Sequence, residues 1–166
     1  MSEPRAEPRI RPARADEADA ILALILPIQR EEFGIEISAA DQPDLFNLDP
    51  FYRQGAGQFW VAEIDGTILG TIALKDLGGG VGALRKMFVA AGWRGRDHGI
   101  ATSLLDTLLA HASAHDLTTI VLGTTDRFLA AHRFYEKHGF EAIAAHDLPE
   151  VFPRMAVDTR FYRRLL

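Results

Sequence analysis

The chain has 166 residues, of which 48% are hydrophobic and 25% are charged, which is enough apolar material for a compact core without disulfides or metals. It contains no cysteine, so disulfide bonds, thiolate metal sites and a cysteine nucleophile are excluded, and a cytoplasmic location is expected. The net charge of -5 argues against a nucleic-acid-binding protein, because such proteins need a basic face to displace counterions.

The first residues resemble a tail rather than a packed element. Residues 1–8 are rich in charge and proline, whereas a signal peptide would need an apolar core. No later apolar run has the length of a bilayer-spanning helix. We therefore expect a flexible tail over 1–8, a single domain over 9–166, and no membrane partner.

The N-terminal third begins with a predicted short strand, Arg9–Arg14, followed by a helix that Asp16 can cap. The helix is predicted from apolar side chains at three- and four-residue spacing: Ile21, Leu22, Ile25 and Leu26. Pro27 should end or kink this helix. Residues 28–57 have no period and contain glycine and proline breakers, so short helical pieces and loops are expected there.

A hairpin is predicted next. The β-prone runs Phe59–Ile64 and Thr67–Leu74 are joined by Asp65 and Gly66, a pair that tolerates the positive φ angles of a two-residue turn. A glycine-rich connection then leads into a further strand, Leu84–Val89. The connection also fits the dinucleotide fingerprint G-x-G-x-x-G/A, but a strand follows it instead of a helix, so the match is attributed to chance.

The next segment predicts a parallel pair of strands. An apolar stripe of helical spacing follows a turn around residues 92–95 and consists of Ile100, Ala101, Leu104, Leu105, Leu108, Leu109 and Ala112. A strand, Thr119–Gly123, comes after it. A strand, a helix and a strand in this order should form a right-handed unit with parallel strands.

The C-terminal part predicts one more helix and two strands. The helix Phe128–Lys137 should stop at Gly139, in the left-handed conformation that ends many helices. A strand, Phe140–Ala145, follows, then two prolines and a last strand, Met155–Asp158. The basic end, Arg160–Leu166, is predicted to be a solvated terminus.

Residues 96–101 are a candidate anion site. They lie between a strand and the apolar helix, so free backbone N–H groups are available at a helix N-terminus, flanked by Arg94 and Arg96. Gly95 and Gly99 would let a pyrophosphate approach the backbone. The alternative is an ordinary tight turn with solvated arginines.

Three segments together resemble the GNAT superfamily of N-acetyltransferases. The acetyl-coenzyme-A signature Arg/Gln-x-x-Gly-x-Gly/Ala is matched by Arg96, Gly99 and Ala101. The run from Ala131 to Phe140 is similar to the family's Ala-x-x-Phe-Tyr-x-Lys-x-Gly-Phe segment, and residues 84–89 resemble its central strand. The resemblance covers about residues 84–140.

The resemblance implies an α+β fold with a mixed, mostly antiparallel sheet of about six to seven strands, a parallel central pair and about four flanking helices. A bulge in the central strand would separate it from the strand at 119–123 and admit the pantetheine arm of acetyl-CoA. Backbone groups of Phe88 and Val89 would bond that arm. The bulge is implied by the resemblance alone, because the spacing does not show it.

The implied activity is transfer of an acetyl group from acetyl-CoA to a primary amine, by direct attack in a ternary complex. The resemblance implies that Tyr135 is the general acid for the thiolate, and that the N–H of Val89 or Phe88 stabilises the oxyanion. Without the resemblance, Tyr135 reads as a core aromatic residue. The residues implied to bind the cofactor are Met87, Phe88, Val89, Arg94, Gly95, Arg96, His98, Gly99, Ile100, Ala101 and Lys137. A noncatalytic acyl-CoA-binding module is the alternative function.

The general base and the acceptor stay open. Candidate bases are the acids Glu31, Glu32, Glu63, Asp76 and Asp126, each of which can equally be a solvated surface residue; ordered water is another route. The acceptor is expected to be a small-molecule amine or a protein amine, chosen by residues 28–57, and a homodimer is left open. No metal is expected, because the histidines at 111 and 115 lack the glutamate of the zinc-protease motif and suit a solvated helix face.

Overall fold

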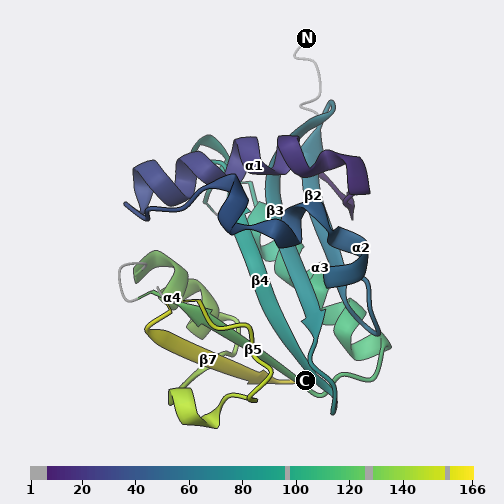
Figure 1. The fold of residues 1–166 in the computed structure, drawn as a ribbon, viewed down its shortest axis with the longest axis vertical. Coiled ribbons are helices and arrows are strands. Elements are labelled where there is room, and N and C mark those ends of the chain that lie inside the picture. The colour runs from purple at the N-terminus through teal and green to yellow at the C-terminus, as the bar shows by residue number, and fades with distance from the viewer. Residues whose placement is uncertain (1–6, 96–97, 126–128, 156–157) are drawn as a thin grey trace.

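The fold is built on a single mixed β-sheet (Figure 1). The computed structural model describes residues 7–95, 98–125, 129–155 and 158–166. Within these residues the strands are β1 (Arg9–Pro12), β2 (Gln58–Ile64), β3 (Thr67–Asp76), β4 (Val81–Val89), β5 (Thr119–Thr124), β6 (Glu141–Ile143) and β7 (Arg160–Leu165). Their order is β1-β2-β3-β4-β5-β7-β6, with β4 and β5 parallel and the other neighbours antiparallel. The predicted hairpin and the predicted parallel pair are confirmed.

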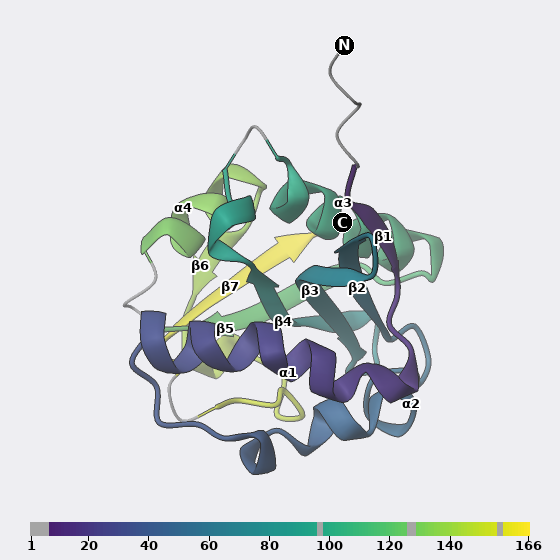
Figure 2. The ribbon, with the colours of Figure 1, turned by 90° about the horizontal axis from the view of Figure 1, so that it is seen from above.

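Helices cover both faces of the sheet (Figures 1 and 2). They are α1 (Ala18–Pro27), α2 (Leu48–Phe51), α3 (Ile100–Ala114) and α4 (Leu129–Lys137). One face carries α1 and α2, and the other carries α3 and α4. A π-helical turn, Ile28–Glu32, continues α1 beyond Pro27. Residues 33–57 consist of loops, short 3-10 turns and the single turn of α2, as expected.

The pleat of β2 divides the core into two layers. Phe59 and Val61 pack in the layer under α1, whereas Trp60 and Ala62 pack in the layer under α3. The predicted apolar stripe of α3 fills the second layer, because Ile100, Leu104, Leu105, Leu108 and Ala112 are all buried. These two layers hold the sheet between its helices.

A bulge in β4 separates it from β5. The register between β3 and β4 shifts between Thr71 and Ala73, and Lys86 has a φ of 53°. A non-glycine residue in this region costs about 1–2 kcal/mol; the buried hydroxyl of Thr71 donates a 2.7 Å hydrogen bond to the Lys86 carbonyl. β4 and β5 pair only from Val81 and Thr119 to Ala83 and Val121, after which they diverge (Figure 1). The expected bulge and separation are confirmed.

The prediction for the C-terminus was wrong. Met155 and Asp158 lie in a loop, and the last strand is β7, Arg160–Leu165. β7 pairs with both β5 and β6, so its backbone is inserted into the sheet rather than solvated. Phe161 and Tyr162 are buried, and their packing outweighs the charge of the neighbouring arginines. The predicted start of α4, Phe128, lies outside the described residues.

The histidines of α3 also differ in part from expectation. His111 is not simply solvated, because its Nε2 lies 2.9 Å from the carbonyl of Ala56 and its ring contacts Trp60 edge-on. His115 stacks on His111 with a centroid distance of 4.0 Å. Among the described residues, no group of three or more histidines or acids is arranged to hold a metal ion. The helices in the described ranges are all too short or too polar to cross a bilayer.

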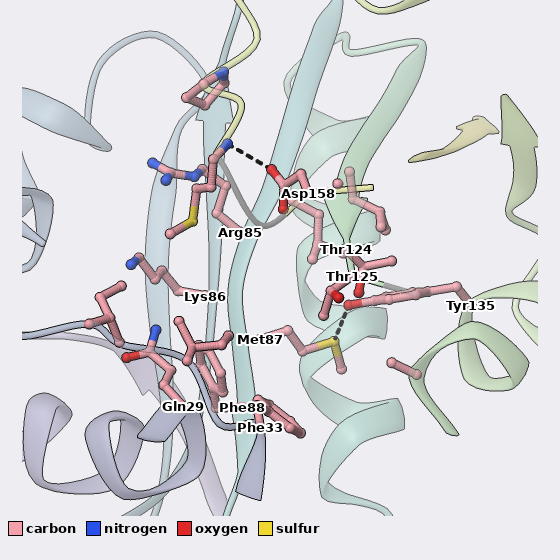
Figure 3. A pocket seen from close by; sticks show the side chains of 18 of the residues that line it. Gln29, Phe33, Arg85, Lys86, Met87, Phe88, Thr124, Thr125, Tyr135 and Asp158 are labelled. Carbon is pink, nitrogen blue, oxygen red and sulfur yellow. Dashed lines mark hydrogen bonds between the residues drawn. The ribbon is translucent and has the colours of Figure 1, made fainter. Parts of the chain in front are cut away.

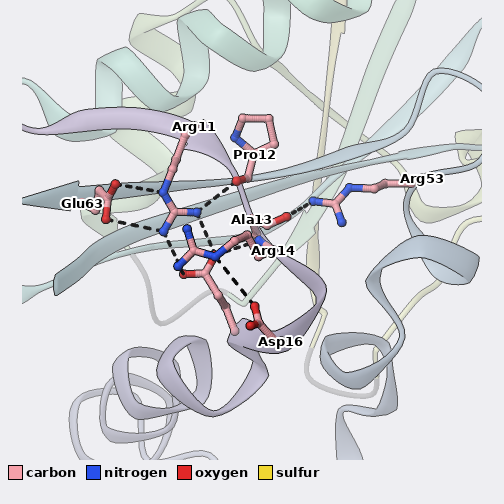
Figure 4. A network of polar contacts seen from close by, with 8 residues as sticks. Arg11, Pro12, Ala13, Arg14, Asp16, Arg53 and Glu63 are labelled. Atoms are coloured by element: carbon pink, nitrogen blue, oxygen red, sulfur yellow. Dashed lines mark hydrogen bonds and ion pairs between the residues drawn. The ribbon is translucent and has the colours of Figure 1, made fainter. Parts of the chain in front are cut away.

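An ion-pair network ties the first strand to the start of α1 (Figure 4). The Arg11 guanidinium donates to Glu17 at 2.7 and 2.8 Å and to Glu63 at 2.9 Å. Glu17 also accepts a hydrogen bond from the backbone N–H of Arg14. The hydrogen bonds from Arg11, with this backbone bond, lower the pKa of Glu17 to about 2.

Candidate active site

A cavity lies where β4 and β5 separate (Figure 3). It is lined by β4, β5 and α4 and by the segment after α1 and the loop before β7: Gln29, Phe33, Ile35, Ile37, Leu84, Arg85, Lys86, Met87, Phe88, Leu122, Gly123, Thr124, Thr125, Ala131, Tyr135, Phe152, Pro153, Met155 and Asp158. Tyr135 reaches it from the α4 face, and Gln29 from the α1 face. Two molecules could therefore meet in the cavity from opposite faces of the sheet.

Tyr135 places a phenol hydroxyl at this gap. Its ring packs edge-on against Phe140 at 5.5 Å and lies near Tyr162, so the side chain is 7% exposed. The hydroxyl points out of that core and donates to the sulfur of Met87 at 3.7 Å. Burial raises the pKa of Tyr135, so the phenol is protonated at neutral pH and can act as a proton donor.

A buried polar network forms the wall under α1. The side-chain amides of Gln29 and Gln42 exchange hydrogen bonds of 3.1 and 3.0 Å. The bulge turns Lys86 into this network, where its Nζ donates to Gln42 Oε1 at 2.6 Å and lies 3.8 Å from Asp44. Burial lowers the pKa of Lys86 to about 8. The Lys86 ammonium therefore already has two partners within the protein, Gln42 and Asp44.

Two further charged groups line one end of the cavity. Arg85 precedes the bulge on β4 and donates a long 3.4 Å hydrogen bond to the hydroxyl of Tyr52. Asp158 is 8% exposed and accepts the backbone N–H of Met155 at 2.9 Å. Its carboxylate packs on β5 at Gly123, where a side-chain carbon would come within 2.8 Å of Oδ2. Burial raises the pKa of Asp158.

The start of α3 offers backbone amides to an anion. Gly99 is the N-terminal cap, with a φ of 65°, and no described side chain caps the helix. Gly95 also has a positive φ, 109°, and a side-chain carbon added at either glycine would meet no atom of the described residues within 4 Å. The first helical hydrogen bond runs from the Ser103 N–H to the Gly99 carbonyl, so the N–H groups of residues 100–102 have no partner within the helix and lie at the positive end of the helix dipole. Ile100 is buried below them and Ala101 is half-buried.

The other predicted cofactor residues are dispersed. Arg94 forms a bidentate ion pair with Glu32 at 2.5 and 3.0 Å and donates to the carbonyl of Val89 at 2.8 Å. It therefore joins the loop after β4 to the turn after α1. His98 is exposed and its ring lies 5.1 Å from that of Trp93. Arg96 lies outside the described residues.

The predicted site residues form two groups. Met87, Phe88 and Tyr135 line the cavity. Arg94, Gly95 and the described residues 98–101 follow the end of β4 at Val89 and do not line the cavity. Lys137 is the exposed last residue of α4 and belongs to neither group. Its role in cofactor binding stays a prediction.

The candidate general bases lie elsewhere. Glu63 is paired with Arg11 at the edge of the sheet, and Asp76 accepts the backbone N–H groups of Ala56 and Gly78. Glu31 is exposed and Glu32 is bound to Arg94. None of these four lines the cavity, and Asp126 lies outside the described residues.

The sequence alone did not predict the polar and charged residues that line the cavity. The sequence predicts Arg85 and Lys86 as part of the central strand and Asp158 as part of a strand, without a role for any of them in the site. Gln29 was not considered. Only Arg85 and Lys86, which lie within the predicted central strand, carried a usable signal, because Gln29 and Asp158 belong to no motif.

The sequence profile described as the Acetyltransferase (GNAT) family matches residues 22–140. The chain belongs to the GNAT family of acetyltransferases. The human N-acetylaspartate synthetase is 34% identical over 131 residues, which are 77% of this chain and 42% of the synthetase. The chain covers between 38% and 51% of the length of the N-acetylaspartate synthetases that it matches.

Two solved structures are similar along almost their whole length. An acetyltransferase of the GNAT family from Staphylococcus aureus Mu50 is 39% identical, with a TM-score of 0.91 over 96% of this chain and 99% of the other. An acetyltransferase from Streptococcus agalactiae 2603 is 28% identical, with a TM-score of 0.90 over 96% and 98%. The fold is therefore that of a GNAT acetyltransferase.

Proposed function

We propose that this chain is an acetyl-CoA-dependent N-acetyltransferase that acts on a primary amine by direct attack in a ternary complex. The observation that carries the proposal is the cavity between β4 and β5, with the Tyr135 hydroxyl at one face and an opening toward α1 at the other. Membership of the GNAT family supports the same reaction.

The residues present fit acetyl-CoA. The amides at the start of α3, with Gly95 and Gly99 leaving their approach open, would hold the diphosphate. β4 beyond Ala83 has no pairing with β5, so backbone groups of Phe88 and Val89 can bond the pantetheine arm as a strand would. When bound, the cofactor supplies the activated acetyl group as a thioester.

Each protein group then has a defined task. Tyr135, which is protonated at neutral pH, would give a proton to the thiolate as it departs. The N–H of Val89 or Phe88 donates to the carbonyl oxygen as negative charge develops there. The acceptor enters from the α1 side, past Gln29 and Lys86.

Thiol release from acetyl-CoA across a library of primary amines tests the proposal. Turnover with at least one amine, together with binding of CoA but not of ATP or NAD in calorimetry, is the expected result. Binding of acetyl-CoA without turnover on any amine would instead favour the noncatalytic acyl-CoA-binding module. Failure to bind CoA would reject both functions.

We further propose that the protein acts in the cytoplasm, which the lack of cysteine supports. A protein amine as acceptor and a homodimer stay predictions. Gel filtration with light scattering would decide the oligomeric state.

A further inference from the structure

Arg85 and Asp158 carry opposite charges at the same end of the cavity (Figure 3). They form no ion pair with each other among the contacts of the described residues, although the charge of Arg85 acts on the carboxyl of Asp158. Because both groups line the same cavity and do not pair with each other, a ligand in the cavity could contact both of them. Such a ligand would need one group of each charge.

Arg85 is the cation that remains available. Its only hydrogen bond within the described part of the chain is the long one to Tyr52, and its guanidinium lies 5.3 Å from the ring centre of Phe51. A guanidinium has five N–H donors in a fork that matches a carboxylate. Lys86, by contrast, already donates to Gln42 and faces Asp44. Arg85 is thus the better anchor for an anion.

Asp158 is the one acidic residue among the described residues that line the cavity. One oxygen, Oδ2, accepts the Met155 N–H, and no described group donates to Oδ1. The carboxylate lies against Gly123 on β5, beside Thr124 and close to the gap that Tyr135 faces. An ammonium bound to Oδ1 would therefore be near the predicted site of acetyl transfer.

We propose that the acceptor is a free α-amino acid bound as a zwitterion, with its carboxylate on Arg85 and its ammonium on Asp158. This inference rests on the proposed function and names the acceptor class of the same site. In an α-amino acid the ammonium is attached to the carbon next to the carboxylate, so both charged groups lie at one end of the molecule. They could therefore contact two protein groups at one end of a cavity. The remaining apolar lining, which includes Ile35, Ile37 and Phe152, is left to the side chain of the acceptor.

Proton and bond changes balance in this arrangement. Asp158 accepts one proton from the ammonium and releases it to solvent, which frees the nitrogen lone pair. The C–N bond forms while the C–S bond breaks, and Tyr135 gives its proton to the thiolate. After the attack the nitrogen loses a second proton to solvent, and the Tyr135 phenolate takes up a proton from solvent. One amide, one thiol and one proton result from the ammonium and the thioester.

The test compares acceptors that differ in one charge. Thiol release is measured with the twenty L-amino acids, with the α-amides of the two best, and with spermidine and tyramine. Because the Arg85 fork would lose its partner in an α-amide, the amino acid should exceed its amide by about 100-fold in kcat/KM. Arg85→Gln should remove this preference by raising KM for the amino acid and leaving the amide nearly unchanged, with partial rescue in Arg85→Lys.

Asp158→Asn should have a different signature. It should lower kcat/KM for the amino acid and for its amide alike, because both carry the ammonium. Arg163→Gln, on β7 outside the cavity lining, is the control and should leave both acceptors unaffected. Circular dichroism verifies that each variant is folded.

Calorimetry provides a readout that does not depend on turnover. With CoA present, the amino acid that binds most tightly in calorimetry should bind the wild-type protein at least about tenfold more tightly than Arg85→Gln. Equal turnover of amines without a carboxylate, or an equal effect of Arg85→Gln on acid and amide, would overturn the inference while the proposed function stands. If no amine is turned over, the proposed function fails, and the calorimetric comparison still decides the inference: no difference between wild type and Arg85→Gln rejects it.

Discussion

Replacing Tyr135 with phenylalanine should separate catalysis from folding. The ring packs against Phe140 and Tyr162 and would stay in place. The hydroxyl makes one described hydrogen bond, a 3.7 Å contact with the sulfur of Met87, so its loss should change the free energy of unfolding by less than about 1 kcal/mol. A general acid contributes about 100-fold or more to the rate, so kcat should fall about 100-fold, which equals about 2.7 kcal/mol of activation free energy.

The assay is thiol release at saturating acetyl-CoA with the best amine from the library. Tyr162→Phe is a matched control, because that buried tyrosine lies in the same core, donates to Glu136 at 3.3 Å and does not line the cavity. It should retain nearly full turnover. Since burial raises the pKa of Tyr135, ionisation of the phenol should not reduce the wild-type rate below about pH 10.

Two results would refute this reasoning. If Tyr135→Phe retains the wild-type kcat while folded, the phenol does not supply the proton. If both variants lose turnover equally, the effect comes from packing in the shared core and not from the hydroxyl at the cavity.

Glu17→Gln should destabilise the protein at neutral pH by about 1–3 kcal/mol, since Arg11 and the Arg14 N–H lower the pKa of Glu17 from 4.5 to about 2 and partial exposure reduces the benefit. Because the pKa of Glu17 is lower in the folded than in the unfolded protein, its stabilisation of the fold is fully present above the unfolded-state pKa and is lost as the pH falls through the folded-state pKa. The free energies of unfolding of wild type and variant should therefore converge between pH 4.5 and 2. A difference that is constant with pH would contradict this. Gly123→Ala should lower kcat/KM about tenfold or more with the fold retained, because the new carbon would lie 2.8 Å from Asp158 Oδ2 and displace that carboxylate. Unchanged kinetics in Gly123→Ala would show that the position of Asp158 is not critical.

Local patterns in the sequence predicted most of the fold. The Asp65-Gly66 turn, the apolar stripe of α3 and the order of strand, helix and strand each express a regular period or a turn preference, and all appear in the structure. The error at β7 has a physical reason. Its arginines indicate exposure when read along the chain, but the strand is inserted between β5 and β6, and that pairing depends on distant segments.

The candidate site was predicted only where a motif exists. Tyr135 and the start of α3 belong to local segments with a family pattern, and the bulge of β4 was implied by the same resemblance. The polar lining of the cavity includes Gln29, Arg85 and Asp158, which are separated by 56 and 73 positions along the sequence. No local rule brings such residues together, because their proximity follows from the sheet order.

A crystal structure of the protein with CoA is the most direct test of the account. We expect the diphosphate on the amides at the start of α3, the pantetheine arm between β4 and β5, and the sulfur within hydrogen-bonding reach of the Tyr135 hydroxyl. A cofactor bound outside the gap, or a Tyr135 hydroxyl directed away from the sulfur, would contradict the account.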